Sequence, residues 1–215
     1  MKTVDVFWSF RSPYSYLATK RLRALPGKWD VRVRPRPVYP LAIRTPDFFA
    51  GIKPQWVPYL MNDIVRLSQY LGLPLGAMNP DPVTMNMMTR EIAKEQPHIH
   101  RLTRLGVLAC EVSDEAGWAF MDEVSTLIWS GGAWTKGTAL ADAATRAGLD
   151  LADMDTRQAA ETDRITAEIE AAQTEQDKLH WGVPLMAFED EAFFGQDRID
   201  LLEWRLEQAG IKRRG

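Results

Sequence analysis

The stretch Val4-Asp5-Val6-Phe7-Trp8-Ser9-Phe10, followed at once by Arg11-Ser12-Pro13-Tyr14-Ser15, decides the fold. Its β-branched and aromatic residues predict a short buried strand over residues 4–10. Serine is preferred at helix N-caps and proline suits the first helical position, so Ser12-Pro13 predicts a helix that runs to Pro26-Gly27. Residues 30–38 alternate with period two and carry prolines, which predicts a second strand at a sheet edge. The chain therefore opens with a predicted strand–helix–strand unit.

The C-terminal part has the same mixed character. Residues 182–188 predict a strand, 189–191 a turn and 192–195 a partner strand. Strands joined by so short a turn must pair antiparallel. Residues 196–198 then open a last predicted helix over residues 199–209.

The middle of the chain reads as helical, with no strand expected. After a predicted loop over residues 46–58, helices are predicted over residues 59–71, 84–95, 101–117, 118–129, 135–147 and 153–179. We therefore predict an α/β fold: a mixed sheet (βαβ … ββα) interrupted by a large all-helical insertion. The sheet domain would consist of residues 1–40 and 180–215, and the inserted domain of residues 41–179.

Composition and charge exclude several classes of protein. The chain has 215 residues, of which 46% are hydrophobic, enough for a substantial core. With 26 basic and 29 acidic residues, its net charge of −3 gives no electrostatic reason to expect nucleic acid as a partner. The N-terminus lacks the apolar segment of a secretory signal, and no stretch reaches the ~20 apolar residues of a membrane span. We expect a cytoplasmic protein with no membrane partner.

Cysteine and histidine are too sparse for metal or dithiol chemistry. The single cysteine, Cys110, excludes an intramolecular disulfide, a Cys-x-x-Cys pair and a cysteine-rich zinc site, and it is expected in the core. His98 and His100 have a metal-like spacing, but zinc sites need three or four protein ligands, so no metal is expected. His180 is interpreted as a helix-end histidine, although it precedes a segment of interest. Most of the eight tryptophans are expected in the core.

Ser12 lies where a strand meets a helix. A helix N-terminus presents free N–H groups and about half a positive charge, which together stabilise a bound anion or thiolate. The Ser12 hydroxyl can donate a further hydrogen bond to such an anion. On position alone, a serine that caps only its own helix is the more common role.

Two further motifs lie near the C-terminus. Val183-Pro184, at the start of a predicted strand, is a candidate cis peptide, the alternative being an ordinary proline at a strand start. Phe194-Gly195-Gln196-Asp197 opens the last helix. Asp197 can complement the helix dipole. Beside free N–H groups it can also help to grip the ammonium and carboxylate of an amino-acid headgroup.

Together these motifs resemble a known family. Residues 7–18, Phe-Trp-Ser-Phe-Arg-Ser-Pro-Tyr-Ser-Tyr-Leu-Ala, resemble the opening of the 2-hydroxychromene-2-carboxylate isomerases and kappa-class glutathione transferases. Gly182-Val183-Pro184 and residues 193–198, Phe-Phe-Gly-Gln-Asp-Arg, resemble the closing motifs of the same group. The segments 59–64 and 73–75 fit the helix that opens the family's insertion.

The resemblance implies a thioredoxin-like fold with an inserted helical domain, as in the disulfide oxidoreductase DsbA. DsbA carries a Cys-x-x-Cys pair at this helix start, where this chain has Ser12-Pro13-Tyr14-Ser15, so dithiol redox chemistry is excluded. It further implies that Ser12 hydrogen-bonds the sulfur of bound glutathione and that Val183 pairs with it through its backbone, ahead of a cis proline. The motif of Phe194, Gly195, Gln196 and Asp197 would hold the γ-glutamyl end, and Lys53 fits a loop that contributes to binding.

The function implied is a glutathione-dependent isomerase that converts 2-hydroxychromene-2-carboxylate to trans-o-hydroxybenzylidenepyruvate in aromatic degradation. Ser12 and the helix dipole would lower the pKa of the glutathione thiol. The thiolate would add to the ring, which opens; a carbon–carbon bond rotates, and elimination returns glutathione. The alternatives are a kappa-like transferase that conjugates another electrophile, and a non-catalytic protein that binds a thiol peptide or a partner chain. The family's usual homodimer is expected.

The chain departs from the family at three positions. Ser9 stands where the family often has aspartate, and Ile52 stands where kappa-type sequences place an asparagine. The tyrosine associated with chromene binding falls near Pro80, where there is no phenol. These departures concern the second substrate more than glutathione.

Overall fold

The computed structural model describes residues 1–86, 89 and 91–214, and at its centre lies a four-stranded sheet of order β2-β1-β3-β4. The strands are β1 (Thr3–Trp8), β2 (Arg32–Pro37), β3 (Leu185–Phe188) and β4 (Glu191–Phe194). β1 pairs parallel with β2 and antiparallel with β3, which pairs antiparallel with β4. The predicted mixed sheet is confirmed, and the proline-bearing β2 lies at its edge as expected.

Helix α1 (Pro13–Lys28) follows β1 after a short loop, and α9 (Ile199–Gln208) follows β4 through the 3₁₀ turn η2 (Gln196–Arg198). The fully buried Trp8, at the end of β1, fixes α1 against the sheet. Its indole Nε1 donates to the Ser15 carbonyl at 3.0 Å and to Thr19 Oγ1 at 2.9 Å. The start of α1 is thus held by the core.

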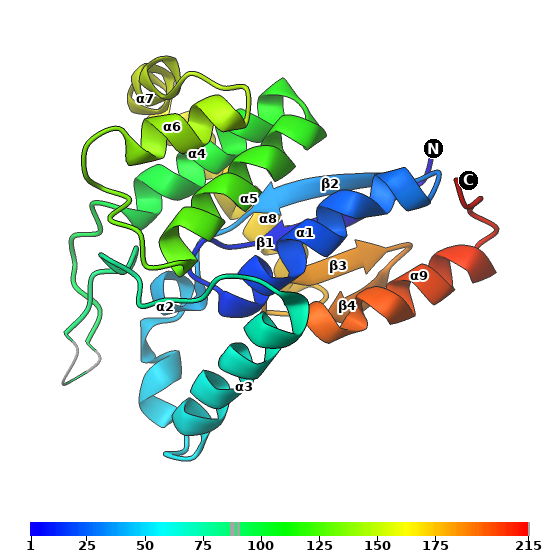
Figure 1. Ribbon diagram of the computed structural model, residues 1–215, viewed down its shortest axis with the longest axis horizontal. Helices are drawn as coiled ribbons and strands as arrows, with labels where there is room; N and C mark the ends of the chain where they lie inside the picture. Colours follow the sequence, from blue (N-terminus) through cyan, green and yellow to red (C-terminus); the bar gives the residue numbers. More distant parts are fainter. Residues whose placement is uncertain (87–88, 90, 215) are drawn as a thin grey trace.

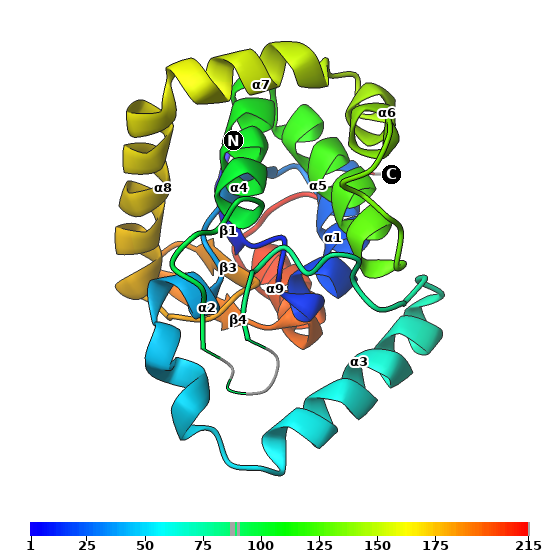
Figure 2. The same ribbon diagram turned by 90° about the vertical axis from the view of Figure 1, so that its left-hand side faces the viewer.

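The remaining helices lie between β2 and β3 in sequence, as predicted for the insertion. They are α2 (Leu41–Arg44), the 3₁₀ helix η1 (Pro46–Gly51), α3 (Trp56–Leu71), α4 (Ile99–Val112), α5 (Asp114–Trp129), α6 (Ala139–Arg146), α7 (Leu151–Ala160) and α8 (Thr162–Asp177). Figures 1 and 2 show α4 to α7 gathered beside β2, with α3 on the opposite side of the molecule. The described residues contain no helix with the length and apolarity needed to cross a bilayer.

Buried tryptophans join the inserted helices to the rest of the chain. Trp118 Nε1 donates to the Val33 carbonyl of β2 at 2.9 Å, and Trp129 Nε1 donates to the Phe10 carbonyl at 3.2 Å. Both tryptophans are at most 4% exposed, as is Trp134. The expectation that they belong to the core is confirmed.

The helix predicted over residues 84–95 is wrong. Part of that segment, residues 87–88 and 90, lies outside the described residues. In the described part, Asn86 N donates to the Glu91 carbonyl at 2.8 Å and Ala93 N donates to the Thr84 carbonyl at 3.0 Å, an antiparallel pairing. The Asn86 side chain accepts from Thr89 N, a local hydrogen bond that competes with the helical backbone.

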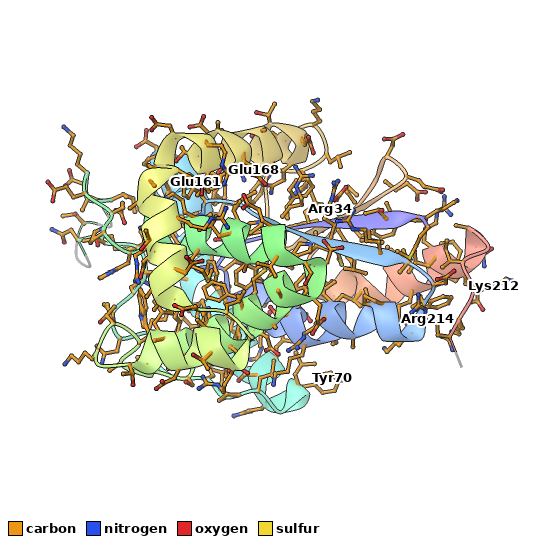
Figure 3. The ribbon with its side chains drawn as sticks, turned by 90° about the horizontal axis from the view of Figure 1, so that it is seen from above. Arg34, Tyr70, Glu161, Glu168, Lys212 and Arg214 are labelled. Atoms are coloured by element: carbon orange, nitrogen blue, oxygen red, sulfur yellow. The ribbon has the colours of Figure 1, made fainter. Side chains whose placement is uncertain are left out.

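Other predicted helices have different ends. The break expected at Gly117 occurs at Ser113, whose side chain accepts from Ala116 N at 3.0 Å and caps α5. The single helix predicted over residues 153–179 is two helices that turn at Glu161. Glu161, which is labelled in Figure 3, accepts there from Arg157 at 3.0 Å and from Arg164 at 2.8 Å.

Two further boundaries also moved. The helix predicted over residues 135–147 begins only at Ala139. The predicted loop over residues 46–58 holds η1 and the first turn of α3, because proline is compatible with the early positions of a helix.

Candidate active site

Ser12 is the N-cap of α1 and contacts the distant C-terminal part of the chain. Its backbone is extended (φ −88°, ψ 118°), and its Oγ accepts from Ser15 N at 3.2 Å. The same hydroxyl donates to the Val183 carbonyl oxygen at 3.2 Å. Ser12 is therefore both the predicted cap and a neighbour of the second predicted motif.

The first turn of α1 carries no acidic residue, and Pro13 has no N–H to donate. The positive end of the helix dipole is thus not neutralised from within the turn. The Tyr14 phenol donates to Asp63 Oδ2 of α3 at 2.7 Å. Burial first, and then this hydrogen bond, raise the pKa of Tyr14 well above its ordinary value, so the phenol stays a donor.

The peptide bond between Val183 and Pro184 is cis, which agrees with its interpretation from the sequence as a candidate cis peptide. The loop before it is held from several sides. The Gly182 carbonyl accepts from the buried Gln176 Nε2 at 2.8 Å, and Gly182 N donates to His180 Nδ1 at 2.9 Å. Arg44 donates to Gln176 Oε1 at 2.8 Å and to the Trp181 carbonyl at 3.3 Å. These bonds fix the Val183 carbonyl opposite Ser12.

The third motif lies beside the second because β4 pairs with β3. Gly195 N donates to the Pro184 carbonyl at 2.9 Å, directly after Phe194 ends the strand. Gly195 has φ +105°, and a Cβ on it would come within 2.6 Å of Asp197 Oδ1, so only glycine fits. The three predicted motifs therefore meet at one end of the sheet, although Ser12 and Val183 are 171 residues apart in sequence.

The polar groups of this motif differ in exposure. Gln196 is 8% exposed, and its backbone and side-chain oxygens accept from Arg21 Nη2 at 2.6 and 2.5 Å. The Asp197 carboxylate is largely exposed and accepts from Arg198 at 2.8 Å. Asp197 also contributes to the raised pKa of Tyr14, so its charge acts at the start of α1.

A family model for the DSBA-like thioredoxin domain matches residues 3–207. The chain belongs to this family. No curated protein matches the sequence.

Solved structures share the DSBA-like fold at low identity. A 2-hydroxychromene-2-carboxylate isomerase is 22% identical, with a TM-score of 0.73 over 96% of this chain and 95% of that one. A probable DsbA oxidoreductase from Streptomyces coelicolor is 17% identical, with a TM-score of 0.65 over 97% and 90%. The cytosolic disulfide reductase DsbM from Pseudomonas aeruginosa, with GSH, is 17% identical, with a TM-score of 0.58 over 95% and 99%. The predicted thioredoxin-like fold with a helical insertion is confirmed.

Unlike a dithiol oxidoreductase, this DSBA-like chain has no cysteine at the start of α1. Ser15, which ends the Ser-Pro-Tyr-Ser motif, is fully buried, and its Oγ has no partner among the described residues. The single cysteine, Cys110, lies on α4 against Gly117, and burial raises the pKa of its thiol. A sulfur at this site must therefore come from a ligand.

Lys53 remains a prediction. It is exposed in the connection between η1 and α3, and no hydrogen bond or ion pair joins its side chain to another described residue. Ile52 lies beside it. Pro80 lies near the position where the resemblance would place a tyrosine. Its carbonyl accepts a hydrogen bond from Trp134 Nε1 at 2.8 Å.

Aromatic rings form a wall beside the site that sequence analysis did not predict. His180 stacks on Phe194 at 4.0 Å and on Trp181 at 5.0 Å between ring centroids, and Trp181 contacts Phe48 at 5.0 Å. Trp181 is 48% and Phe194 40% exposed, so an apolar surface faces solvent here. A Cβ on Gly182 would come within 2.3 Å of the Phe194 ring, which explains the glycine. His180 is thus part of the site's surroundings.

Sequence analysis missed two residues that hold site residues in place: Arg21, which donates to Gln196, and Asp63, which accepts from Tyr14. Their signal is weak because each is a single charged residue far from its partner in sequence. Arg21 lies seven residues, or two turns, beyond Tyr14, on the same face of α1. The remaining histidines, His98 and His100, pack against Trp134 and Tyr39. Among the described residues, no three histidines, cysteines or carboxylates are grouped to hold a metal ion.

Proposed function

We propose that this protein is a glutathione-dependent isomerase of the 2-hydroxychromene-2-carboxylate type, producing trans-o-hydroxybenzylidenepyruvate. The observation that carries the proposal is the Ser12–Val183 hydrogen bond of 3.2 Å at the start of α1, next to the Gly195-Gln196-Asp197 turn. A solved isomerase of that name with the same fold, and the DsbM structure with GSH, support it.

The groups present match the polar groups of glutathione. The Ser12 hydroxyl and the start of α1 offer hydrogen-bond donors and positive potential for a thiolate. The Gln196 amide offers a donor for the γ-glutamyl carboxylate, and the Asp197 carboxylate offers an acceptor for the ammonium. Lys53 would bind a further carboxylate from the exposed loop.

Bound glutathione would supply a nucleophilic thiolate that adds to the substrate and is later eliminated. The Ser12 hydroxyl has one hydrogen, and in this structure it donates that hydrogen in a hydrogen bond to the Val183 carbonyl. A sulfur anion at the helix start would compete for that proton, and the hydroxyl can rotate toward it while still accepting from Ser15 N. The Tyr14 phenol, held by Asp63, keeps its proton and cannot act as a base near neutral pH.

The aromatic wall gives the second substrate a surface. The exposed rings of Trp181 and Phe194 suit a planar aromatic carboxylate. We further propose that the protein works as a homodimer in the cytoplasm, without nucleic acid or membrane partners.

A kappa-like glutathione transferase is the second candidate. The sequence has no tyrosine near Pro80, where the isomerase resemblance would place one. Pro80 itself accepts a hydrogen bond from Trp134, and its neighbour Asp81 forms an ion pair with Arg11. A site without that phenol favours a different electrophile. The thiolate site would be the same, and glutathione would leave as a conjugate.

Calorimetric titration of glutathione into the wild type, Ser12→Ala and Asp197→Ala tests the proposal. We expect wild-type binding, weakened in both variants. Ser113→Ala is the matched control, because Ser113 caps α5 through an equivalent hydrogen bond of 3.0 Å and lies in the helical insertion. It should lose cap stability of about 1 kcal/mol but no affinity.

Turnover of 2-hydroxychromene-2-carboxylate with catalytic glutathione, followed by absorbance, then separates the two enzymes. Isomerisation without loss of free thiol supports the isomerase. Consumption of thiol with an electrophile supports the transferase. Absence of wild-type binding at millimolar glutathione would refute both and leave a non-catalytic protein that binds another partner.

A further inference from the structure

Arg21 is a partly buried cation without a carboxylate partner. Among the described residues, no acidic side chain comes within 4.0 Å of it, whereas most of the other arginines described form ion pairs. Its side-chain hydrogen bonds all go to one residue, Gln196, whose backbone oxygen and Oε1 accept from Nη2 at 2.6 and 2.5 Å. Buried charges are normally paired, so this arrangement calls for a reason.

The contact fixes which way the Gln196 amide points. A guanidinium carries only donors, so the amide oxygen must face Arg21 and the amide nitrogen must face away. Gln196 is 8% exposed, yet its Nε2 is not among the fully buried atoms that lack a partner. No described residue accepts a hydrogen bond from it. The amide thus presents N–H groups outward, backed by a guanidinium that has no carboxylate within ion-pair distance, although the charges of Asp200, Asp197 and Glu203 act on it from further away.

We propose that Arg21 is a positioning residue that makes Gln196 a receptor for the α-carboxylate of a ligand's γ-glutamyl group. Asp197, next in the chain and exposed, receives the ammonium of the same group. The pair thereby distinguishes the two ends of the zwitterion: carboxylate on the Arg21–Gln196 side, ammonium on the Asp197 side. This inference rests on the proposed function, because it assumes that glutathione is the ligand.

Three ligands separate the two ends. Glutathione has both groups, glutaryl-Cys-Gly keeps the carboxylate and lacks the ammonium, and 4-aminobutyryl-Cys-Gly keeps the ammonium and lacks the carboxylate. Each is titrated calorimetrically into the wild type, Arg21→Met, Gln196→Glu and Asp197→Asn. Arg23→Met is the matched control, since Arg23 lies on the same helix but pairs with Glu115 and Asp122.

We expect Arg21→Met to weaken glutathione and glutaryl-Cys-Gly about tenfold, the effect of losing one hydrogen bond to a charged group. Affinity for 4-aminobutyryl-Cys-Gly should stay unchanged. Gln196→Glu keeps an acceptor for Arg21, so folding is preserved, but it removes the N–H donors and should weaken the same two ligands more. Asp197→Asn should show the opposite selectivity, and Arg23→Met none.

Equal weakening of all three ligands in Arg21→Met and Gln196→Glu would overturn the inference, because it would reduce Arg21 to a structural role. Wild-type affinity in Gln196→Glu would also overturn it. Binding of none of the three ligands by the wild type would instead refute the proposed function itself.

Discussion

Replacing Gly195 by alanine tests whether the turn after β4 places Asp197. Gly195 has φ +105° and ψ 155°, a region that is essentially restricted to glycine. A side chain there costs about 1–3 kcal/mol of stability. For a chain of this length, each kcal/mol lowers Tm by about 2–4 °C, so Gly195→Ala should melt about 2–12 °C below the wild type.

The added methyl also displaces the carboxylate. An alanine Cβ would lie 2.6 Å from Asp197 Oδ1, and real Cβ atoms do not approach other atoms closer than 3.0 Å, so the oxygen must retreat by at least 0.4 Å. A charge-assisted hydrogen bond contributes about 1.5–3 kcal/mol, and the exposed Asp197 side chain can move aside, so we expect the displaced carboxylate to weaken glutathione binding by up to about tenfold. Calorimetry gives the affinity and scanning calorimetry gives Tm.

Gly148→Ala separates the two effects. Gly148 also has a positive φ, +76°, but nothing lies within 4 Å of its added Cβ. It should lose about 1–2 kcal/mol of stability with no change in glutathione affinity. The reasoning fails if Gly195→Ala binds glutathione as tightly as the wild type, or if Gly148→Ala loses affinity to the same extent.

Three further predictions concern the surroundings of the site. Tyr14→Phe leaves the Asp63 carboxylate without its 2.7 Å donor, so it should destabilise the fold by about 1–2 kcal/mol in denaturant titration; an unchanged midpoint would contradict the link between α1 and α3. Asp81→Asn weakens the bidentate ion pair with Arg11, whose hydrogen bonds are 2.8–3.1 Å long. Its Tm should fall by a few degrees at low salt and by less at high salt, because salt screens the ion pair. A decrease in Tm that does not depend on salt would argue against an ionic role. Burial lowers the pKa of all three histidines, His180 included, below the value of about 6.5 that they have when unfolded. The unfolded chain therefore binds more protons below that pH, and Tm should fall as pH drops from about 7 toward 5; a flat profile would refute this, and His180→Gln should reduce the slope.

The parts of the fold that sequence predicted are those set by local signals. Ser12-Pro13 at the end of an apolar strand specifies a capped helix regardless of the remaining chain, and the structure has that cap. Ser113-Asp114-Glu115 carries an equally local signal, a cap with acidic residues in the first turn, but the break was predicted later, at Gly117. The segment around Asn86 could not be predicted in this way, because its turn depends on side-chain hydrogen bonds that compete with a helix.

In the candidate site, too, the features set by local sequence were predicted, and those that depend on distant contacts were not. Its three motifs were found because each has a recognisable local composition, and the sheet order brings them together. Arg21 was not found, because its bond to Gln196 spans 175 residues and neither residue alone suggests the other. The aromatic wall of His180, Trp181 and Phe48 likewise exists only after folding.

A serine at the start of α1 changes what the rest of the site must do. A helix start stabilises a thiolate whether the sulfur belongs to the protein or to a ligand. When it belongs to the protein, as in a Cys-x-x-Cys enzyme, the sulfur is held by its own backbone. With Ser12 in that place, the ligand must be positioned by groups remote from its sulfur, and the entropy of fixing it must be offset there. The exposed Asp197 and the Gln196 amide that Arg21 orients are groups of the required kind, on the turn hydrogen-bonded to Pro184. We therefore expect the double variant Arg21→Met/Asp197→Asn to lose glutathione binding while Ser12 and its cap stay intact.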